Sequence, residues 1–243
     1  MKSLRFALLF ALAAAPAAAA PSQYDACMAQ AQSNPGGGLM MAGNWAKKGG
    51  GAPADHCAAV ALVGLHRFGE AAQKLDVLAK SPFASDPARR SALYDQAGNA
   101  WLLGDRPDAA IASFTAALNA DPTDPDLLAD RARALAMKNN WPKAESDLSM
   151  ALMVMPDRAD LYILRGSARH AMGRIPDARA DIDRALRLSP GNADALLERG
   201  NMKFESGDAA GARADWQQAA SSAPNGPTAQ IARQHLADSA QGH

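Results

Sequence analysis

The tetrapeptide "ARAD" occurs at residues 178–181 and again at 212–215, and the related "AESD" lies a further 34 residues upstream at 144–147. The leading alanine of each continues a series that begins at Ala110. A bulky apolar residue follows each alanine four positions later, and a small residue follows that one after three more. Residues three or four apart share one face of an α-helix. A fixed period with this spacing indicates stacked helical repeats.

Five positions recur in each of four consecutive units. They are the alanines Ala110, Ala144, Ala178 and Ala212, the bulky residues Phe114, Leu148, Ile182 and Trp216, the small residues Ala117, Ala151, Ala185 and Ala219, the closing prolines Pro122, Pro156, Pro190 and Pro224, and, twelve residues before each alanine, Gly98, Ala132, Gly166 and Gly200. Turn signals such as "GRIPD" at 173–177 divide each unit into two helices. Neither helix pair can bury its apolar face alone, so neighbouring units must stack.

The first unit resembles the tetratricopeptide repeat pattern W-x₂-L-G-x₂-Y…A-x₃-F…P. The matching residues are Tyr94, Ala97, Gly98, Trp101, Ala110, Phe114 and Pro122. The resemblance covers residues 91–224, with Ala132 in place of a glycine and with Arg169 and Lys203 where the pattern has an aromatic residue. It implies an all-α, right-handed α-solenoid of helix-turn-helix repeats, closed by an N-terminal helical cap and a C-terminal capping helix.

The expected organisation follows from these repeats. A helical cap spans 21–53, a degenerate repeat-like unit and linker span 54–90, four repeats span 91–124, 125–158, 159–192 and 193–224, and a capping helix with its tail spans 225–243. The glycine runs at 36–38 and 49–51 are expected to form loops that bound the helices of the cap. Residues 83–90 are expected to lengthen the connection that precedes the first full repeat.

The first twenty residues, "MKSLRFALLFALAAAPAAAA", have the layout of a cleavable signal peptide. Lys2 and Arg5 precede an apolar stretch and then a run of small residues. This pattern predicts export, and with the alanine-rich composition it favours a bacterial periplasm. The rest of the chain has no apolar run long enough to cross a membrane. With 25 basic and 25 acidic residues and no basic block, nucleic-acid binding is not expected.

The chain has two cysteines, Cys27 and Cys57. An oxidising compartment favours a disulfide between them, which would tie the N-terminal helices to the degenerate unit. The alternative is a reactive cysteine with His56 as its base. Neighbours on a helix point about 100° apart, which disfavours that arrangement. The histidines lack the spacing of zinc ligands, so neither a metal nor a cofactor is expected.

A basic series shares the 34-residue period with the aspartates of the opening motif. The arginines are Arg131, Arg165 and Arg199, and the aspartates are Asp147, Asp181 and Asp215. The first unit lacks both charges, with Ala97 and Ser113 at these positions. We therefore predict a ladder of Arg–Asp ion pairs, either within a unit or between adjacent units. The alternative is that the arginines face a groove and hold a ligand carboxylate.

The resemblance implies that the concave surface, formed by the first helix of each repeat, binds peptide segments of partner proteins. The implied groove residues are Asp95, Asn99, Leu102, Leu103, Ala129, Arg133, Ala136, Met137, Ile163, Ser167, His170, Leu197, Asn201, Phe204 and Glu205. Interior positions for Leu102, Leu197 and Phe204 remain open. We expect a scaffold or adaptor without catalytic residues, serving for example envelope protein assembly. The alternative function is that of a small-ligand binder or enzyme with a pocket around Trp45, His56 and Cys57.

Overall fold

The structure is a computed structural model that describes residues 22–240, so the predicted signal peptide at 1–20 lies outside it. Every regular element in this range is helical, which confirms the all-α prediction. The helices are α1 (Gln23–Ser33), α2 (Pro35–Lys47), α3 (Gly51–Gly64), α4 (Phe68–Ala79), α5 (Pro87–Leu103), α6 (Pro107–Ala117), α7 (Pro125–Met137), α8 (Trp141–Val154), α9 (Ala159–Ala171), α10 (Ile175–Leu188), α11 (Ala193–Glu205), α12 (Ala209–Ser222) and α13 (Pro227–Ala240), with a 3₁₀ turn at Pro82–Ala84.

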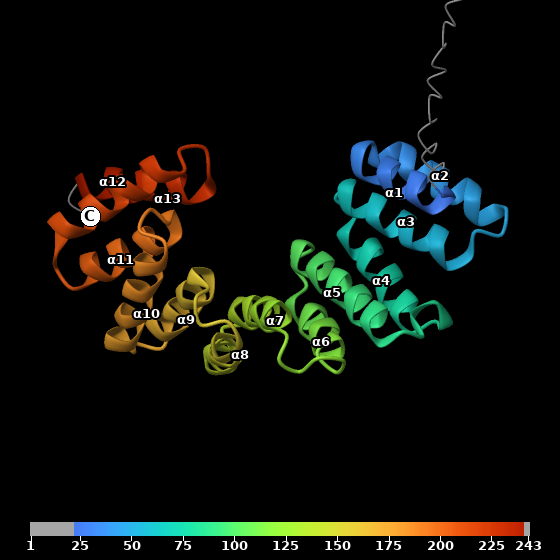
Figure 1. The fold of residues 1–243 in the computed structure, drawn as a ribbon. Helices are drawn as coiled ribbons and strands as arrows, with labels where there is room; N and C mark the ends of the chain where they lie inside the picture. The colour runs from blue at the N-terminus through green and yellow to red at the C-terminus, as the bar shows by residue number, and fades with distance from the viewer. Residues whose placement is uncertain (1–21, 241–243) are drawn as a thin grey trace, which may run out of the picture.

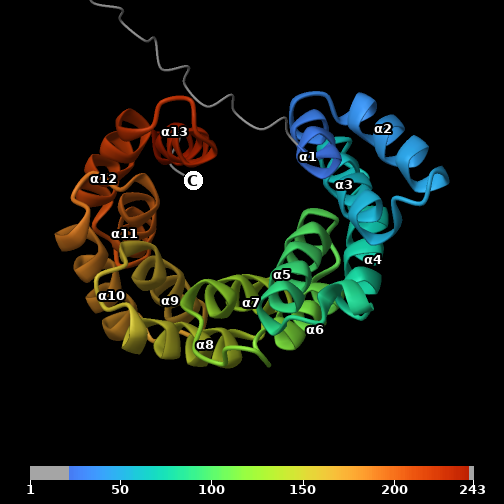
Figure 2. The same ribbon diagram turned by 45° about the vertical axis from the view of Figure 1, so that its right-hand side comes forward.

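Consecutive helices pack as pairs that stack into a curved solenoid (Figure 1). The four full repeats are the pairs α5–α6, α7–α8, α9–α10 and α11–α12, and α13 packs against the last pair. Figure 2 shows the first helix of each pair on the inside of the curve and the second on the outside. We call α5, α7, α9 and α11 the inner helices. They form the concave surface on which the implied groove residues lie.

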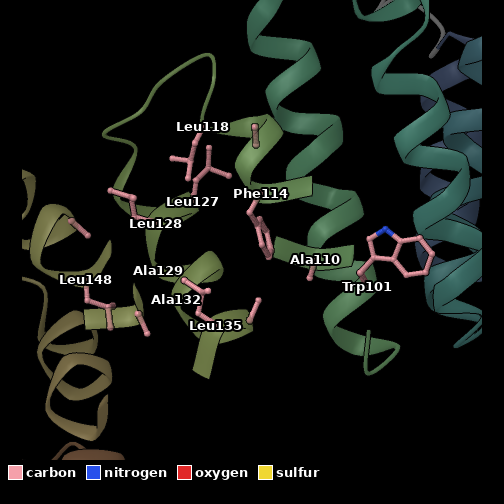
Figure 3. Close-up of a cluster of buried hydrophobic side chains, with 14 of the residues drawn as sticks. Trp101, Ala110, Phe114, Leu118, Leu127, Leu128, Ala129, Ala132, Leu135 and Leu148 are labelled. Atoms are coloured by element: carbon pink, nitrogen blue, oxygen red, sulfur yellow. The ribbon is translucent and has the colours of Figure 1, made fainter. Parts of the chain in front are cut away.

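The repeated small and bulky positions meet inside each pair. A Cβ atom added to Gly98 would lie 2.6 Å from the ring of Phe114, and one added to Gly200 would lie 2.6 Å from Trp216 Cδ1. The bulky residue of the second helix therefore fills the space that the missing side chain leaves on the first. Phe114 is fully buried and lies in a continuous core that runs into the next repeat (Figure 3). This close approach accounts for the 34-residue pattern.

Each arginine of the charged series meets the aspartate of its own unit in a two-pronged contact. Arg131 donates from Nε and Nη2 to the two carboxylate oxygens of Asp147, at 2.8 Å each. Arg165 and Arg199 repeat this geometry with their aspartates at 2.7–2.9 Å. The aspartates are buried, and a carboxylate in the interior requires such paired donors. We call these three contacts the Arg–Asp ladder.

Two of these arginines also reach the preceding repeat. Arg131 Nη1 donates to Thr115 Oγ1 of α6, and Arg165 Nη1 donates to Ser149 Oγ of α8, both at 3.3 Å. One guanidinium group thus connects an inner helix with the outer helix of its own repeat and with that of the repeat before. The sequence left open whether the pairs lie within a unit or between units. The ion pair lies within one repeat, and the Nη1 atom of the arginine donates a hydrogen bond to the preceding repeat.

The departures from the aromatic pattern supply second cations to this ladder. Arg169 Nη1 donates to Asp181 Oδ2 at 2.8 Å, and Lys203 Nζ lies 2.7 Å from Asp215 Oδ2. Burial alone would raise the pKa of Asp215, but hydrogen bonds from Arg199 and Lys203 outweigh it and hold that pKa below its usual value. The two substitutions thus exchange aromatic packing for charge pairing.

The first repeat, which lacks both ladder charges, uses a different carboxylate. Asp76 on α4 accepts a hydrogen bond from Ser113 Oγ and another from Trp101 Nε1, both at 2.9 Å. These two residues lie on α6 and α5, so Asp76 connects the degenerate unit to both helices of the first repeat. The carboxylate of Asp76 is thus hydrogen-bonded by two uncharged donors, an indole N–H and a hydroxyl.

The N-terminal cap is held to the solenoid by a disulfide between Cys27 on α1 and Cys57 on α3. The prediction that the first glycine run forms a loop is wrong, because Gly36, Gly37 and Gly38 lie in α2. Asn34 accepts a hydrogen bond from the Gly37 N–H and caps this helix. A Cβ atom on Gly38 would lie 2.4 Å from the Ala31 Cα, so the glycine permits α1 and α2 to touch.

The connection before the first repeat is shorter than expected, because α5 begins at Pro87 and takes up the second half of the predicted linker, residues 87–90. Asp86 accepts a hydrogen bond from the Arg89 N–H at 3.0 Å, and Pro87 occupies the first turn. Both residues favour a helix start at this point. The inner helix of the first repeat is therefore extended at its N-terminal end.

We predict that Arg131→Ala destabilises the protein more than Arg165→Ala. Among the described residues, Arg131 is the one arginine or lysine within ion-pair distance of Asp147, whereas Asp181 keeps Arg169 when Arg165 is removed. An unpaired interior carboxylate costs several kcal/mol, and partial exposure reduces that to about 2–3 kcal/mol for Arg131→Ala and about 1–2 for Arg165→Ala. Urea unfolding followed by circular dichroism measures both values.

Arg67→Ala is the matched control for these variants. Arg67 also makes a two-pronged contact with a carboxylate, Glu70, but both side chains are about half exposed. Exposed pairs contribute little, and we expect a much smaller loss of stability than for Arg131→Ala. Equal effects of Arg131→Ala and Arg67→Ala would show that the ladder does not stabilise the repeats.

Candidate functional site

Fourteen of the fifteen implied groove residues are at least partly exposed on the inner helices. The exception is Ala129, whose assignment to the groove surface is wrong: it is 1% exposed. Ala129 lies in the core cluster together with Phe114 and Leu128 (Figure 3). The corresponding position holds Ile163 in the next repeat, which is half-buried and packs against the core from the groove side.

Large apolar side chains are exposed at the C-terminal ends of three inner helices. Leu103 on α5 is 59% exposed, Met137 on α7 is 47% exposed and Phe204 on α11 is 41% exposed. We call these three residues the apolar edge. Leu102 and Leu197 are half-buried and pack against the core, so of the three residues left open only Phe204 is exposed.

The N-terminal halves of α5 and α7 border a cleft of about 650 Å³ that carries strong negative charge. Its lining residues are Asp86, Pro87, Ala88, Ser91, Ala92, Asp95, Ala120, Asp121, Asp124, Asp126, Leu127 and Asp130. Six of the twelve are aspartates and none is basic. We call this the acidic cleft. Of its aspartates, only Asp95 was among the implied groove residues.

The electrostatics of the acidic cleft centre on Asp95. Burial and the neighbouring charges of Asp130, Asp124 and Asp126 together raise the pKa of Asp95 to about 6. A hydrogen bond from Asn99 Nδ2 at 2.9 Å opposes this rise. The carboxylates of the two helices are therefore close enough to repel one another.

Two arginines compensate part of this charge at the margin of the cleft. Arg133 forms an ion pair with Asp130, and Arg158 Nη1 lies 2.5 Å from Asp126 Oδ1. Arg158 also pairs with Asp160 on α9 and thereby links two successive repeats. Asn99 Nδ2 spans the cleft, since it donates to Asp130 at 3.2 Å as well as to Asp95. The cleft remains acidic overall because six aspartates face two arginines.

His170 connects the inner helices of the last two repeats. Its Nε2 lies 2.7 Å from Glu205 Oε2 and its Nδ1 lies 3.5 Å from Glu198 Oε1. Burial alone would lower the pKa of His170, but the two glutamates outweigh it and raise that pKa. A cavity of about 290 Å³ adjoins this cluster. It is lined by His170, Asn201, Phe204, Glu205, Trp216, His235, Asp238 and Ser239.

The residues proposed for a pocket at the cap do not converge on one. His56 is buried, and its two ring nitrogens lie 2.6 Å from the Tyr24 hydroxyl and 2.9 Å from Gln96 Oε1. The sulfur of Cys57 is in the disulfide. Trp45 lines a separate surface hollow that neither of these residues reaches. This geometry argues against the alternative function, because neither a free thiol nor an available imidazole faces a cavity.

Sequence reasoning missed most of the acidic cleft, although a signal was present. The segment 121–130 holds four aspartates and no basic residue. The prolines and aspartates of this segment match the pattern of turns and helix caps. That interpretation accounts for each aspartate locally and therefore does not predict that they line one cleft. The contribution of α5 to the same cleft depends on three-dimensional packing. Within residues 22–240, no cluster of three or more His, Cys, Asp or Glu side chains is arranged to hold a metal ion, and no helix is both long and apolar enough to span a membrane.

One tetratricopeptide repeat family model matches residues 58–125 and 163–227, which together are more than half of the chain. The chain belongs to the tetratricopeptide repeat family. A second model of the same family matches residues 102–168, so the matches together cover the degenerate unit and all four repeats. The search of curated proteins gives no match.

Solved structures of tetratricopeptide repeat proteins are similar to this chain. MamA residues 41 to the end from Desulfovibrio magneticus RS-1 is 17% identical with a TM-score of 0.61, covering 72% of this chain and 97% of that one. Another crystal structure of MamA is 18% identical, with a TM-score of 0.57 and coverages of 68% and 93%. The first TPR of Spaghetti (RPAP3), bound to the HSP90 peptide SRMEEVD, is 28% identical with a TM-score of 0.48, covering 49% of this chain and 95% of that one. The likeness to MamA concerns the fold.

We predict that Asp95→Asn stabilises the protein at neutral pH. The folded-state pKa of Asp95 lies above its unfolded value, so ionisation of this group opposes folding, and its penalty grows as pH rises through about 6. Asparagine removes the charge and keeps the shape. We expect the melting temperature to rise by about 2–4 °C at pH 7.5, corresponding to roughly 1 kcal/mol, with a much smaller rise at pH 4.5. Thermal unfolding at both pH values measures the difference.

Asp157→Asn serves as the control, because Asp157 is exposed in the loop after α8, pairs with Arg184 and does not line the acidic cleft. It is expected to leave the melting temperature nearly unchanged at both pH values. An Asp95→Asn variant that is less stable than the parent at pH 7.5 would contradict the electrostatic account of the cleft.

Proposed function

We propose that the protein is a non-catalytic scaffold that binds an extended or helical segment of a partner protein along its concave surface. The observation that carries this proposal is the apolar edge: Leu103, Met137 and Phe204 are all exposed on inner helices. Large exposed apolar side chains that gather on one surface mark sites of interaction. Solenoids use their extended concave surfaces in this way.

The polar groove residues fit a role in positioning a peptide backbone. Ser167 on α9 and Asn201 on α11 are half-exposed and carry groups that can hydrogen-bond a main chain. The carbonyl oxygen of Asn201 accepts a hydrogen bond from Trp216 Nε1 at 3.0 Å, which holds its amide group in a defined orientation. Apolar contacts would then supply affinity, and these amide and hydroxyl groups would supply register.

We further propose that the protein is exported and acts in the periplasm. The signal-like pattern of residues 1–20 and the interior disulfide between Cys27 and Cys57 support this location. Disulfides persist in oxidising compartments and are rare in the cytosol. Envelope protein assembly is the process that we propose the scaffold serves.

Site-specific photo-crosslinking tests the binding surface. A photoreactive amino acid at Met137 or Ser167 is expected to capture a partner segment in cells, because both side chains are at least partly exposed on inner helices. Met153, which is 86% exposed near the end of outer helix α8, provides the matched position. Mass spectrometry of the crosslinked peptides identifies the captured segment.

Capture from Met137 and Ser167 but not from Met153 supports the proposal. Capture confined to Met153 would contradict it and assign binding to the outer surface. Equal capture from all three positions would also contradict a dedicated groove.

The location has its own test. We expect the protein recovered from cells to lack about the first twenty residues and to fractionate with the periplasm, because a signal peptide is removed on export. Intact-mass measurement after thiol alkylation should show both cysteines protected until a reductant is added. Recovery of the full-length chain with two alkylated thiols would contradict export.

A further inference from the structure

We infer that the concave surface selects a partner segment in which basic residues accompany apolar ones, and that a lysine or arginine side chain of this segment enters the acidic cleft. This inference rests on the proposed function and specifies the chemistry of the partner. It has two supports, the charge of the acidic cleft and the apolar edge at the other ends of the inner helices.

The charge of the acidic cleft is incompletely compensated within the protein. Asp95 and Asp130 come from neighbouring inner helices and share the amide of Asn99. Asp130 also pairs with Arg133, whereas no arginine or lysine of the described residues lies within ion-pair distance of Asp95. Burial, followed by the charges of Asp130, Asp124 and Asp126, raises the pKa of Asp95. A cation that enters the cleft would relieve this repulsion and gain attraction from several carboxylates at once.

The form of the acidic cleft fits a side chain better than a bare ion. Its volume of about 650 Å³ is much larger than a metal ion requires. Its carboxylates are distributed along two helices and the loop before α7, and they do not form a group arranged to hold a metal. A lysine or arginine brings a long apolar stem as well as a charge, and the stem can pack against Ala92 and Leu127 in the lining.

The apolar edge indicates that the cation belongs to a protein segment and not to a small polyamine. Leu103 and Met137 lie at the C-terminal ends of α5 and α7, the same two helices whose N-terminal halves line the cleft. A segment that runs obliquely along these two helices can place a basic residue at their N-terminal ends and an apolar residue at their C-terminal ends.

Synthetic peptides test the inference directly. An extended chain advances about 3.3 Å per residue and packed helices lie about 8–10 Å apart, so a peptide of about 12 residues spans the four inner helices. The probe is a fluorescein-labelled peptide of repeated serine, lysine and leucine. One comparison peptide has glutamate in place of lysine, and another has serine in place of leucine. Fluorescence anisotropy with the mature chain measures binding of each.

The protein variants isolate the cleft. Asp95→Asn with Asp130→Asn removes two charges from it, and Asp108→Asn with Asp157→Asn removes two exposed charges from outer helix α6 and the loop after α8. We expect the Asp95→Asn/Asp130→Asn variant to bind the lysine–leucine peptide about tenfold more weakly at low salt than the parent does. The Asp108→Asn/Asp157→Asn variant is expected to change this affinity by less than about twofold. Circular dichroism confirms that each variant is folded.

Four results would overturn the inference. They are equal or tighter binding of the glutamate peptide, no difference between the two double variants, undiminished binding of the peptide that lacks leucine, and displacement of the lysine–leucine peptide by equimolar Ca²⁺ or spermidine. Failure of the inference differs from failure of the proposed function: photo-crosslinking from Met137 would still capture a segment, but that segment would carry no basic residues.

Discussion

The contact on which the rest of the structure depends is the Arg–Asp ladder, in which two of the three arginines bridge three helices. Arg131 and Arg165 each hold a buried aspartate of their own repeat with two nitrogens and reach the preceding repeat with the third. A planar guanidinium has fixed donor directions, so the contact restrains orientation as well as distance. Successive repeats are therefore held at a defined angle, and the sum of these angles gives the curve in Figure 2.

The ladder also determines what remains available on the concave surface. Because Arg131, Arg165 and Arg199 are engaged with aspartates between helices, they do not face the groove to hold a ligand carboxylate. The negative charge of the first two inner helices is thus left with little opposing charge on the concave surface. One set of aspartates is paired in the interior, and another set lines the acidic cleft.

The sequence allowed the fold to be predicted because its information is local and repeated. The spacing of Gly98, Ala110 and Phe114 predicts which residues pack against one another, and the same spacing recurs in three further repeats. The groove could be predicted only approximately. Exposure depends on how neighbouring repeats are rotated, so Ala129 and Ile163 occupy equivalent positions with different accessibility. The acidic cleft was out of reach because it joins α5 to the loop before α7, and no periodic pattern connects them.

The departures from the family pattern were visible in the sequence, but their meaning was not. In the sequence, Arg169 and Lys203 stand where the family pattern has an aromatic residue. In the structure, each forms an ion pair with a buried aspartate. In the same way, the first glycine run suggested a loop, because a helical glycine is favoured only where another backbone approaches closely. Gly38 is such a position.

A double-mutant cycle on Arg131 and Asp147 tests the central claim most directly. The free energies of unfolding of the parent, the two single alanine variants and the double variant give the coupling between these side chains, free of their separate contributions. If the ladder holds the repeats together, the coupling is about 2 kcal/mol or more, as expected for a hydrogen-bonded ion pair removed from solvent. A coupling within about 0.3–0.5 kcal/mol of zero would mean that the two residues act independently, and would contradict the account.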